Sequence, residues 1–472
     1  MGAALLLLGV PSIAAAPGSP APHLRLVTAS SSVTLTRFPG RPVPLDIGVF
    51  VASLDAPFVL HVTRPAYPSP IQVHQMLGGG ATRELPGWIA DGWTGLAGFT
   101  RIQVRDHSGH VVARTRMTFC PDAQDVERVG AGPAQSPYPE FCPTNAFTRG
   151  SVWGIAKGWA SRITGPYGGA PMLLQVPDGR YTATVAIARP YRRLFGISQQ
   201  DGTTDISLSI RTQTTQQAPR NTPVEQVAGT PSPRVPTMTH PDPSVLPELI
   251  PLPAYHILSA RVGGRDFLEF AANVWNAGPS PLSVEGFRRE GTNVMDAYQY
   301  FYDAAGGNPV GRASVGTFEY DPRPGHEHWH FRQFARYTLL DASKQNVVVS
   351  EKEAFCLTPT EPIDLLRRGA NWDPENVGFG SACGDASSVW TRETLDAGWG
   401  DTYIQSLPGQ SFDITDLPNG TYYIEVRTNP AGRLYERDNS NDVVLRRVRL
   451  GGSPGNRTVH VPPWHGIDSD GP

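Results

Sequence analysis

The chain has 472 residues, including 49 Gly and 46 Pro, and only 18% of its residues are charged. Long amphipathic helices need charged faces and few Gly or Pro, so this composition argues against a mainly helical protein and favours a turn-rich β protein with two domains plus tails. The net charge of −3 gives no support for nucleic-acid binding, and no apolar run is long enough for a membrane span.

The beginning of the chain, residues 1–24, resembles a secretory signal. Leu5 to Leu8 form a short apolar core, and the small residues Ala14 to Ala16 follow as a cleavage site. The basic residues that usually precede such a core are absent, and a buried N-terminal strand is the alternative interpretation. We expect a secreted, extracellular protein.

The cysteine count agrees with an oxidising compartment. Four cysteines in an exported chain predict two disulfides. Three pairings are open, of which the local one, Cys120–Cys142 with Cys356–Cys383, keeps one bridge in each half of the chain. Cys-x-x-Cys does not occur, which argues against a zinc ribbon or a thioredoxin-like site.

Residues 25–213 predict an N-terminal β-sandwich domain of unknown role. Short apolar runs between turn residues predict strands within 46–64, 101–106, 111–120, 181–188 and 205–210, and those over 101–106 and 111–120 are expected to form a hairpin. Four tryptophans offer a surface for contact with sugars or with the cell envelope, although core packing is their more common role: Trp88, Trp93, Trp153 and Trp159.

A Pro-rich linker is predicted over residues 214–245, which hold seven prolines and little that a core could bury. A second strand-rich domain follows over residues 246–452, with strands expected near 268–274, 422–427 and 443–450. Residues 453–472 contain many Gly and Pro and predict a flexible tail. The expected fold class is therefore mostly β, with two β-sandwich-like domains joined by a Pro-rich linker.

One turn sequence occurs in both halves of the chain. The run from Val176 to Tyr181 resembles the run from Leu417 to Tyr422, and each leads into a predicted strand. A shared turn geometry is a sufficient explanation, and two related sandwiches are the alternative.

The strongest chemical signal is the run from Gly325 to His330, in which three of the twelve histidines, His326, His328 and His330, fall within five residues. Alternate residues of a strand face one side, so the three imidazoles would project together. Imidazole binds copper, zinc, iron and nickel. A chance cluster on a solvated loop is the alternative.

Geometry adds a constraint to this histidine cluster. Alternate residues on a strand lie about 6.7 Å apart, which is too far for three imidazoles on a flat strand to reach one ion. A strong twist or a bulge is therefore expected near His328. Asp321 and Glu327 are the nearest carboxylates in the sequence, and either could orient an imidazole; ordinary surface charges are the alternative.

Lys352 is one of only three lysines among 40 basic residues. We expect a strand over 347–357, in which Lys352, Ala354 and Cys356 share a face, so a buried Cys356 would direct Lys352 inward. An arginine would serve at most solvated positions of this chain, whereas an amine nucleophile cannot be arginine. A solvated lysine beside Glu351 and Glu353 is the alternative.

Several motifs follow one another in order and with matching spacing: Leu246-Pro247-Glu248-Leu249, the three alternating histidines, Lys352 ahead of Phe355-Cys356-Leu357, Asp401-Thr402-Tyr403 ten residues before Asp413-Ile414-Thr415-Asp416, and Asp438 to Val443. In these motifs the block from Leu246 to about Gly452 resembles the catalytic domain of the lysyl oxidase family. The abundance of arginine over lysine suggests a bacterial member. Two cysteines in this block, and the run Phe331 to Arg336 after the histidines, depart from the animal members of the family.

The resemblance implies a secreted copper-dependent amine oxidase that converts primary amines, either peptidyl lysine or small amines, to aldehydes with O₂. It implies copper at His326, His328 and His330, and a lysine tyrosylquinone built from Lys352 and Tyr403. In that chemistry copper and O₂ oxidise the tyrosine ring, the lysine amine adds to it, and the quinone condenses with the substrate amine. A base then removes a proton from the substrate carbon, hydrolysis frees the aldehyde, and O₂ reoxidises the cofactor, releasing peroxide and ammonia. Asp401 is the candidate base, and a turn cap is its alternative role.

Two rival functions remain open on the sequence alone. The first is a cupin-like dioxygenase or a hydrolytic zinc enzyme, against which Arg332 and Gln333 count because cupins place a glutamate there. The second is an exported adhesin or envelope-binding β-sandwich with a structural metal. A quinone stain of copper-loaded protein distinguishes both from an amine oxidase.

Overall fold

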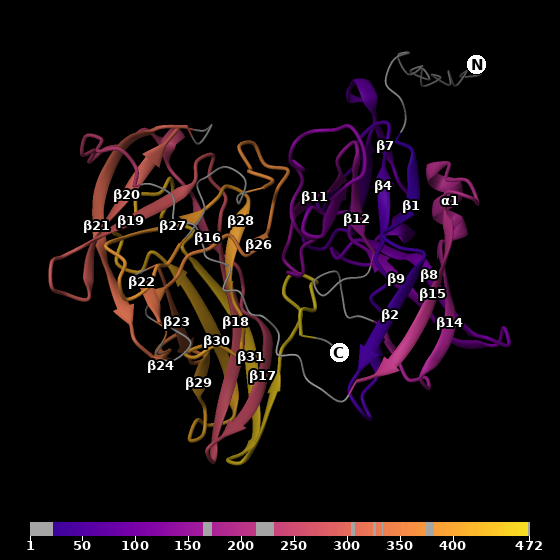
Figure 1. The fold of residues 1–472 in the computed structure, drawn as a ribbon. Helices are drawn as coiled ribbons and strands as arrows, with labels where there is room; N and C mark the ends of the chain where they lie inside the picture. The colour runs from indigo at the N-terminus through magenta and orange to yellow at the C-terminus, as the bar shows by residue number, and fades with distance from the viewer. Residues whose placement is uncertain are drawn as a thin grey trace, which may run out of the picture.

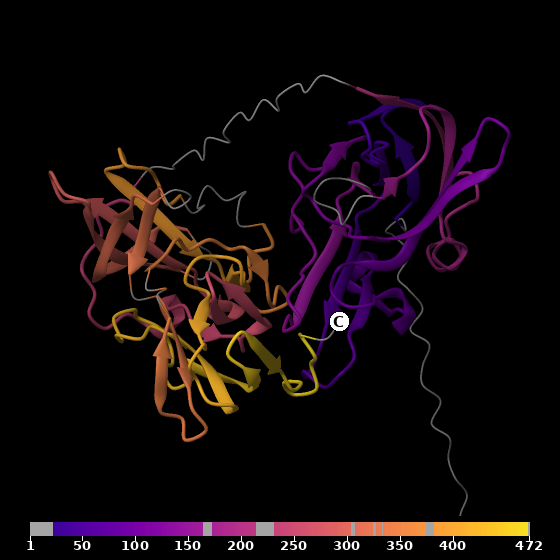
Figure 2. The same ribbon diagram turned by 90° about the horizontal axis from the view of Figure 1, so that it is seen from below.

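The structure is a computed structural model that describes residues 22–470 except 164–171, 214–230, 304–306, 324–326, 333, 351, 353 and 374–381. The protein is mostly β, as predicted, and Figures 1 and 2 show two β-rich bodies, one from each half of the chain. The described helices are short: α1 (Arg189–Phe195) and the 3₁₀ turns η1 (Gly78–Gly80), η2 (Gly87–Ile89) and η3 (Pro243–Val245). No helix in the described ranges has the length and apolar character needed to cross a membrane.

Within the described residues, four sheets belong to the N-terminal half. The first two have the orders β1-β4-β12-β10 and β11-β5-β6-β7, with strands β1 (Leu24–Thr28), β4 (Val49–Ser53), β12 (Trp159–Arg162), β10 (Val126–Arg128), β11 (Gly150–Ile155), β5 (Phe58–Thr63), β6 (Gln72–Met76) and β7 (Thr82–Glu84). The other two are β13-β3 and β2-β15-β14-β8-β9, with strands β13 (Leu173–Leu174), β3 (Val43–Pro44), β2 (Ser32–Arg37), β15 (Thr203–Thr212), β14 (Gly179–Ile187), β8 (Leu96–Asp106) and β9 (Val111–Phe119).

In the part of the C-terminal half that the structure describes, there are three sheets. One has the order β16-β18-β28-β26, with β17 and β29 also paired to β18: β16 (Leu249–Pro251), β18 (Arg265–Asn276), β28 (Trp399–Tyr403), β26 (Glu361–Pro362), β17 (Tyr255–Val262) and β29 (Ser411–Asp413). The second is β25 (Ala354–Phe355), β22 (His328–Arg332), β21 (Pro309–Asp321), β20 (Val294–Tyr302), β19 (Leu282–Arg288) and β27 (Trp390–Leu395). The third is β24 (Asn346–Val349), β23 (Ala335–Leu340), β30 (Gly420–Thr428), β31 (Val443–Ser453) and β32 (Asn456–His460).

The strands expected from apolar alternation are present, including the predicted hairpin, in which β8 pairs with β9. The repeated turn sequence also has one geometry in both halves. The hydroxyl of Tyr181 donates to the carbonyl of Pro177 at 2.9 Å, and that of Tyr422 donates to the carbonyl of Pro418 at 2.8 Å. Each tyrosine therefore anchors the start of its strand to the preceding turn, which supports the simpler explanation of the repeat.

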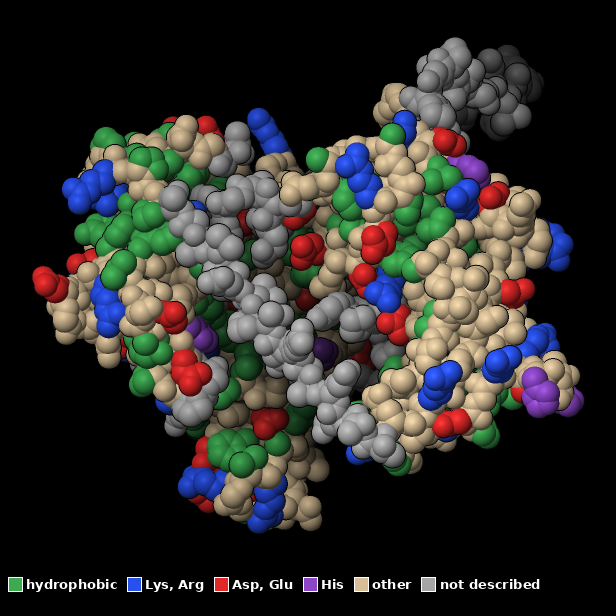
Figure 3. Space-filling view, viewed as in Figure 1, with side chains coloured by type: hydrophobic (Ala, Val, Ile, Leu, Met, Phe, Trp, Pro, Cys, Tyr) green, Lys and Arg blue, Asp and Glu red, His purple; other side chains and the backbone are tan. Residues whose placement is uncertain are grey.

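The four tryptophans of the N-terminal half do not form an exposed aromatic surface. Trp93 and Trp153 are buried in the core, Trp159 is half-buried, and only Trp88 is largely exposed, at 49%. On the face shown in Figure 3, basic and acidic side chains are interspersed over both bodies. A sugar-binding tryptophan platform is therefore absent from the described part of this half.

The expectation of a flexible C-terminal tail needs correction. Residues 453–472 were expected to be flexible, but β32 pairs with β31, and the buried side chains of Arg446 and Asp470 form an ion pair at 2.9 Å. Trp464 also packs against Tyr67 of the N-terminal half, with ring centroids 5.0 Å apart. In β32 the half-buried Arg457 and Val459 alternate with exposed residues, which is a strand pattern. The many Gly and Pro residues around it led to the prediction of a flexible tail.

The predicted linker and signal are only partly described. Residues 231–245 lie on the C-terminal half, where the Met238 N–H donates to the Arg312 carbonyl at 2.9 Å and the Arg312 N–H donates to the Pro236 carbonyl at 3.0 Å. Residues 214–230 of the linker and residues 1–21 of the signal lie outside the described residues. β1 begins at Leu24, the last residue of the predicted signal.

Candidate active site

The histidine cluster lies on β22, which pairs with the end of β21. His328 and His330 face the same side, their ring centroids are 4.5 Å apart, and Trp329 points the opposite way into the core. The register between β21 and β22 is regular from Asp321↔His328 onward, so the bulge expected near His328 is absent from the described strand. The two imidazoles converge through their side-chain conformations instead. His326 lies outside the described residues.

The predicted strand over 347–357 is interrupted beside Lys352. β24 ends at Val349 and β25 begins at Ala354. The Ser350 hydroxyl accepts the N–H of Lys352 at 3.1 Å and donates to the carbonyl of Gly409 at 2.5 Å, so this serine replaces the strand ladder with a local turn. Gly409 has φ +81°, and a Cβ there would lie 3.0 Å from the Cβ of Lys352, so the close approach requires glycine.

Lys352 is buried, with 7% of its surface exposed, as the sequence predicted. Its Nζ lies 4.3 Å from the centroid of the Tyr403 ring and 5.2 Å from that of Phe355. Burial lowers the pKa of Lys352 to about 8, although the carboxylates of Asp401, Asp321 and Glu393 act in the opposite direction. A neutral amine is therefore accessible near neutral pH.

The Tyr403 ring is fixed by the backbone of Cys356. Its hydroxyl donates to the Cys356 carbonyl and accepts the Cys356 N–H, each at 3.0 Å. Cys356 is in turn bonded to Cys383, and the other disulfide joins Cys120 to Cys142, so the local pairing is the one present. Burial and the neighbouring Asp401 raise the pKa of the Tyr403 phenol.

Two buried carboxyl groups accompany the lysine and the tyrosine. Asp401 lies two residues before Tyr403 on β28, and Glu393 lies on β27. Burial raises the pKa of both groups well above the ordinary value. Oε2 of Glu393 accepts the Leu357 N–H at 2.9 Å, whereas Oε1 of Glu393 and Oδ2 of Asp401 both have no hydrogen-bond partner among the described residues. Glu393 was missed from the sequence because it belongs to none of the motifs.

These groups surround a common cavity of about 380 Å³. It is lined by His328, His330, Lys352, Cys356, Thr358, Thr360, Asp401, Thr402, Tyr403, Leu407 and Pro408. The structure therefore brings together every predicted site residue that it describes.

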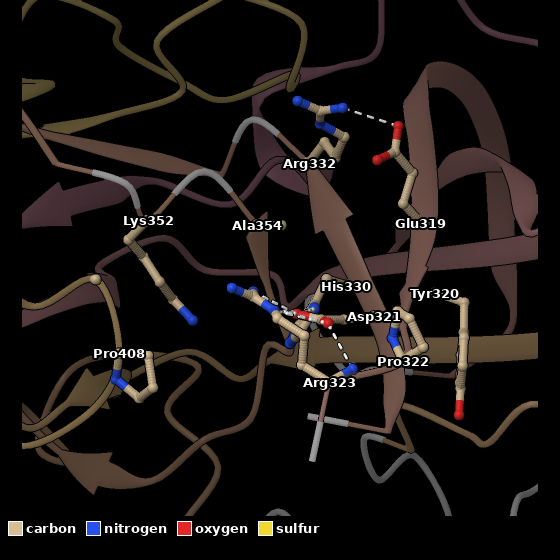
Figure 4. Close-up of a pocket in the computed structure, with 11 residues that line it drawn as sticks. Glu319, Tyr320, Asp321, Pro322, Arg323, His330, Arg332, Lys352, Ala354 and Pro408 are labelled. Carbon is tan, nitrogen blue, oxygen red and sulfur yellow. Dashed lines mark hydrogen bonds and ion pairs between the residues drawn. The ribbon is translucent and has the colours of Figure 1, made fainter. Parts of the chain in front are cut away.

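A second hollow of about 300 Å³ adjoins this cavity and shares His330, Lys352 and Pro408 with it. Figure 4 shows the Lys352 side chain reaching toward it across from His330 and Asp321. Its rim carries two ion pairs, Arg323 with Asp321 and Arg332 with Glu319 at 2.8 Å. Cations and anions are thus balanced at this rim.

Of the two carboxylates expected to orient an imidazole, Asp321 is near one. Its Oδ2 lies 3.9 Å from Nδ1 of His330, while Glu327 is exposed to solvent. Asp321 is also held by Arg323, whose guanidinium Nε lies 2.9 Å from Oδ1. A carboxylate beside a ring nitrogen fixes the tautomer of a metal-binding imidazole, so this position suits the predicted role.

The donor set fits a copper ion. Two imidazoles converge on one cavity wall, and imidazole is a ligand type that suits copper; a carboxylate lies beside one of them. A second group of donor atoms, Cys356, Cys383 and Glu393, lies within 4.8 Å of one another. Its two sulfur atoms are bonded to each other, so it offers no thiolate for a metal.

The comparison with known proteins matches this region. Residues 312–459 match the family model described as lysyl oxidase, and this range contains all of the predicted site residues. Protein-lysine 6-oxidase of Rattus norvegicus is 33% identical over 129 residues, which cover 27% of this chain and 28% of the relative. The Sus scrofa protein of the same name is also 33% identical, with 45% of the relative covered. Lysyl oxidase homolog 2 of Homo sapiens is 30% identical over 128 residues and 15% of its length. The chain thus spans less than half the length of these relatives.

Proposed function

We propose that the protein is a secreted copper-dependent amine oxidase that converts primary amines to aldehydes, because residues 312–459 match the lysyl oxidase family model. The observation that carries the proposal is the position of the Lys352 amine, 4.3 Å from the centroid of the Tyr403 ring. Both side chains line a cavity with two imidazoles. A nucleophile, an oxidisable ring and metal ligands in one buried site are the parts that a side-chain-derived quinone requires.

Lys352 supplies the nucleophile in this proposal. An amine must lose its proton before it can attack carbon, and burial lowers the pKa of Lys352 to about 8. The amine lies over the ring of Tyr403, which is the direction from which a lone pair adds to a ring carbon. Arginine could not do this, which accounts for a lysine in a chain that uses arginine almost everywhere else.

The proposed copper ligands are His326, His328 and His330, with Asp321 orienting the imidazole of His330. When bound, copper would supply the oxidation of the phenol by O₂, and the lysine tyrosylquinone would supply an electrophilic carbonyl that accepts two electrons from the amine. Cys356 holds the Tyr403 ring through its backbone, so the ring keeps one orientation beside Lys352.

Asp401 is the proposed base. It lines the cavity, and its Oδ2 is without a hydrogen-bond partner among the described residues, so one oxygen is available to take the proton from the substrate carbon. The overall reaction balances as RCH₂NH₂ + O₂ + H₂O giving RCHO + NH₃ + H₂O₂. The proposed substrates are peptidyl lysine or small amines, because the cavity of about 380 Å³ accepts an alkylamine chain.

Secretion and envelope contact belong to the same proposal. Two disulfides and the family of the chain support an extracellular location. The proposal also includes contact with the cell envelope through the N-terminal half. The tryptophans of that half do not supply the surface for this contact.

The test is peptide mapping of purified protein that has been loaded with copper in air. We expect a covalent link between the peptides that contain Lys352 and Tyr403, together with a positive quinone stain, and both signals should be lost in Tyr403→Phe. Bound metal without a link and without a stain would overturn the proposal in favour of a cupin-like enzyme or a metal-binding adhesin.

A further inference from the structure

The two halves of the chain meet at the strand next to the candidate active site. We call residues 141–150 of the N-terminal half the clamp loop; it begins at Phe141, contains Cys142 and ends at Gly150, the first residue of β11. Figure 1 shows β26 and β28 on the side of the C-terminal half that faces β11. A parallel bridge joins Gly150 to Asp364, directly after β26. The halves therefore share backbone hydrogen bonds at this point.

Glu361 is the centre of this contact. Its Oε1 accepts the backbone N–H of Thr144 at 2.5 Å and that of Asn145 at 2.9 Å, and its Oε2 accepts the hydroxyl of Thr144 at 3.1 Å. The side chain is buried, with 7% exposed. A buried carboxylate is costly unless it is hydrogen-bonded, so the loop and the glutamate depend on each other.

The contact continues along the backbone beyond Glu361. The N–H of Arg149 donates to the carbonyl of Ile363 at 2.7 Å, and the N–H of Leu365 donates to the carbonyl of Gly150 at 2.9 Å. A Cβ at Gly150 would lie 2.2 Å from Oδ1 of Asp364, so a larger residue there would force this carboxylate to move. The clamp loop thus holds both the side chain and the backbone of residues 361–365.

The strand that the clamp loop holds is paired with the strand that carries Asp401 and Tyr403. Glu361 is in register with Gly400, and the Thr402 N–H donates to the hydroxyl of Thr360 at 2.8 Å. Phe141 contacts the buried Trp399 at the start of β28, with ring centroids 5.7 Å apart. Two independent contacts from the N-terminal half therefore fix β28 within four residues of Tyr403.

We propose that Glu361 is a positioning residue and that the clamp loop sets the place of β28, so the N-terminal half is an integral part of the active site and not a separate binding module. The consequence for catalysis rests on the proposed function. The placement of β28 itself does not, because it follows from hydrogen bonds that are independent of any cofactor. The disulfide from Cys120 to Cys142 anchors the loop two residues before Thr144.

The test uses three full-length variants prepared without metal. Glu361→Ala removes all three hydrogen bonds. Glu361→Gln keeps the oxygen that accepts both backbone N–H groups, and its amide can donate to the Thr144 hydroxyl. Leu208→Ala opens a cavity in the core of the N-terminal half, away from β26, and controls for a general loss of stability.

The first readout is hydrogen exchange of the amides of residues 399–403 in the metal-free proteins. We expect exchange at least tenfold faster in Glu361→Ala, within twofold of wild type in Glu361→Gln, and unchanged in Leu208→Ala. Equal exchange in wild type and Glu361→Ala, or an equal rise in the Leu208→Ala control, would overturn the positioning role.

The second readout is the rate at which the quinone appears after copper and air are added. We expect a fall of at least tenfold in Glu361→Ala and near wild-type rates in the other two variants. Faster exchange with an unchanged rate of quinone formation would leave the contact structural and refute its positioning role. Failure of the wild type to form a quinone would instead refute the proposed function, and the exchange result would then decide the placement of β28 alone.

Discussion

The Nζ of Lys352 lies above the ring of Tyr403, 4.3 Å from its centroid. The two residues come from different segments, since Lys352 lies between β24 and β25 and Tyr403 ends β28. Cys356 connects them, because it lies four residues after the lysine and holds the tyrosine hydroxyl with its backbone. A short tether therefore fixes the distance between an amine and the carbon atoms that it would attack.

Lys352→Met should abolish the cross-link and leave the protein folded. The variant removes the only amine near the ring among the described residues and replaces a buried cation with an apolar side chain. We expect no joined peptide by mass spectrometry and a free energy of unfolding higher by about 1–3 kcal/mol. Lys352→Arg is the matched control, which should also lack the link but should lose stability. A cross-linked peptide in either variant would contradict the proposed cofactor.

The rate of quinone formation should depend on pH through Lys352. Burial lowers the pKa of this amine from 10.5 to about 8, so the folded protein releases the proton as pH rises through 8 while the unfolded chain keeps it until about 10.5. The neutral amine therefore increases about tenfold per pH unit below 8. We expect the initial rate to rise from pH 6 and to level off above about 8.

The same shift makes a prediction for stability. Between pH 8 and 10.5 the unfolded chain binds more protons than the folded protein, so the free energy of unfolding of metal-free protein should rise with pH relative to Lys352→Met. Denaturant titrations at several pH values measure this difference. In the preceding experiment, an inflection in the rate of quinone formation well above pH 10 would assign the titration to the Tyr403 phenol, whose pKa is raised by burial, and not to Lys352.

The strands were predictable because period-two alternation is a local property of the sequence. The expected hairpin from β8 to β9 and the late strands β30 and β31 are all present. Alternation failed at Ser350, where a side chain competes with the strand ladder, and at the C-terminal tail, where a strand exists despite many Gly and Pro residues. The first failure depends on a partner far away in the sequence, Gly409, whereas the second is a local hairpin between β31 and β32.

The site was predictable only where residue types carry chemistry by themselves. The alternating histidines and the rare lysine stand out in the sequence, and the family resemblance supplied Tyr403. Glu393 and Glu361 could not be found in this way. Each is an ordinary glutamate whose importance comes from burial and from a partner in another segment. Glu393 accepts the N–H of Leu357, and Glu361 accepts the N–H of Thr144.

Removal of one imidazole should weaken copper binding strongly. His328→Ala and His330→Ala each delete a donor that faces the cavity, and we expect the dissociation constant for copper to rise at least about 100-fold, with His326→Ala behaving alike. Asp321→Asn keeps the donors and removes the carboxylate beside His330, so a smaller rise of about 10–100-fold is expected. Competition with a chelator measures these values. His110, on the exposed β8–β9 turn, provides the control His110→Ala, and an equal loss of copper there would contradict the assignment.

The two buried carboxyl groups should differ in their contribution to turnover. Each has one oxygen without a hydrogen-bond partner among the described residues, but Asp401 lines the cavity, whereas Glu393 is not among the residues that line it and its other oxygen accepts the Leu357 N–H. We therefore expect Asp401→Asn to lower kcat for an alkylamine by about 10²–10⁴-fold with little change in KM. Glu393→Gln should change kcat by less than about fivefold. Titration with phenylhydrazine gives the quinone content of each variant, so a slow variant that still carries its cofactor can be recognised. A larger loss of kcat in Glu393→Gln than in Asp401→Asn would reassign the base to Glu393.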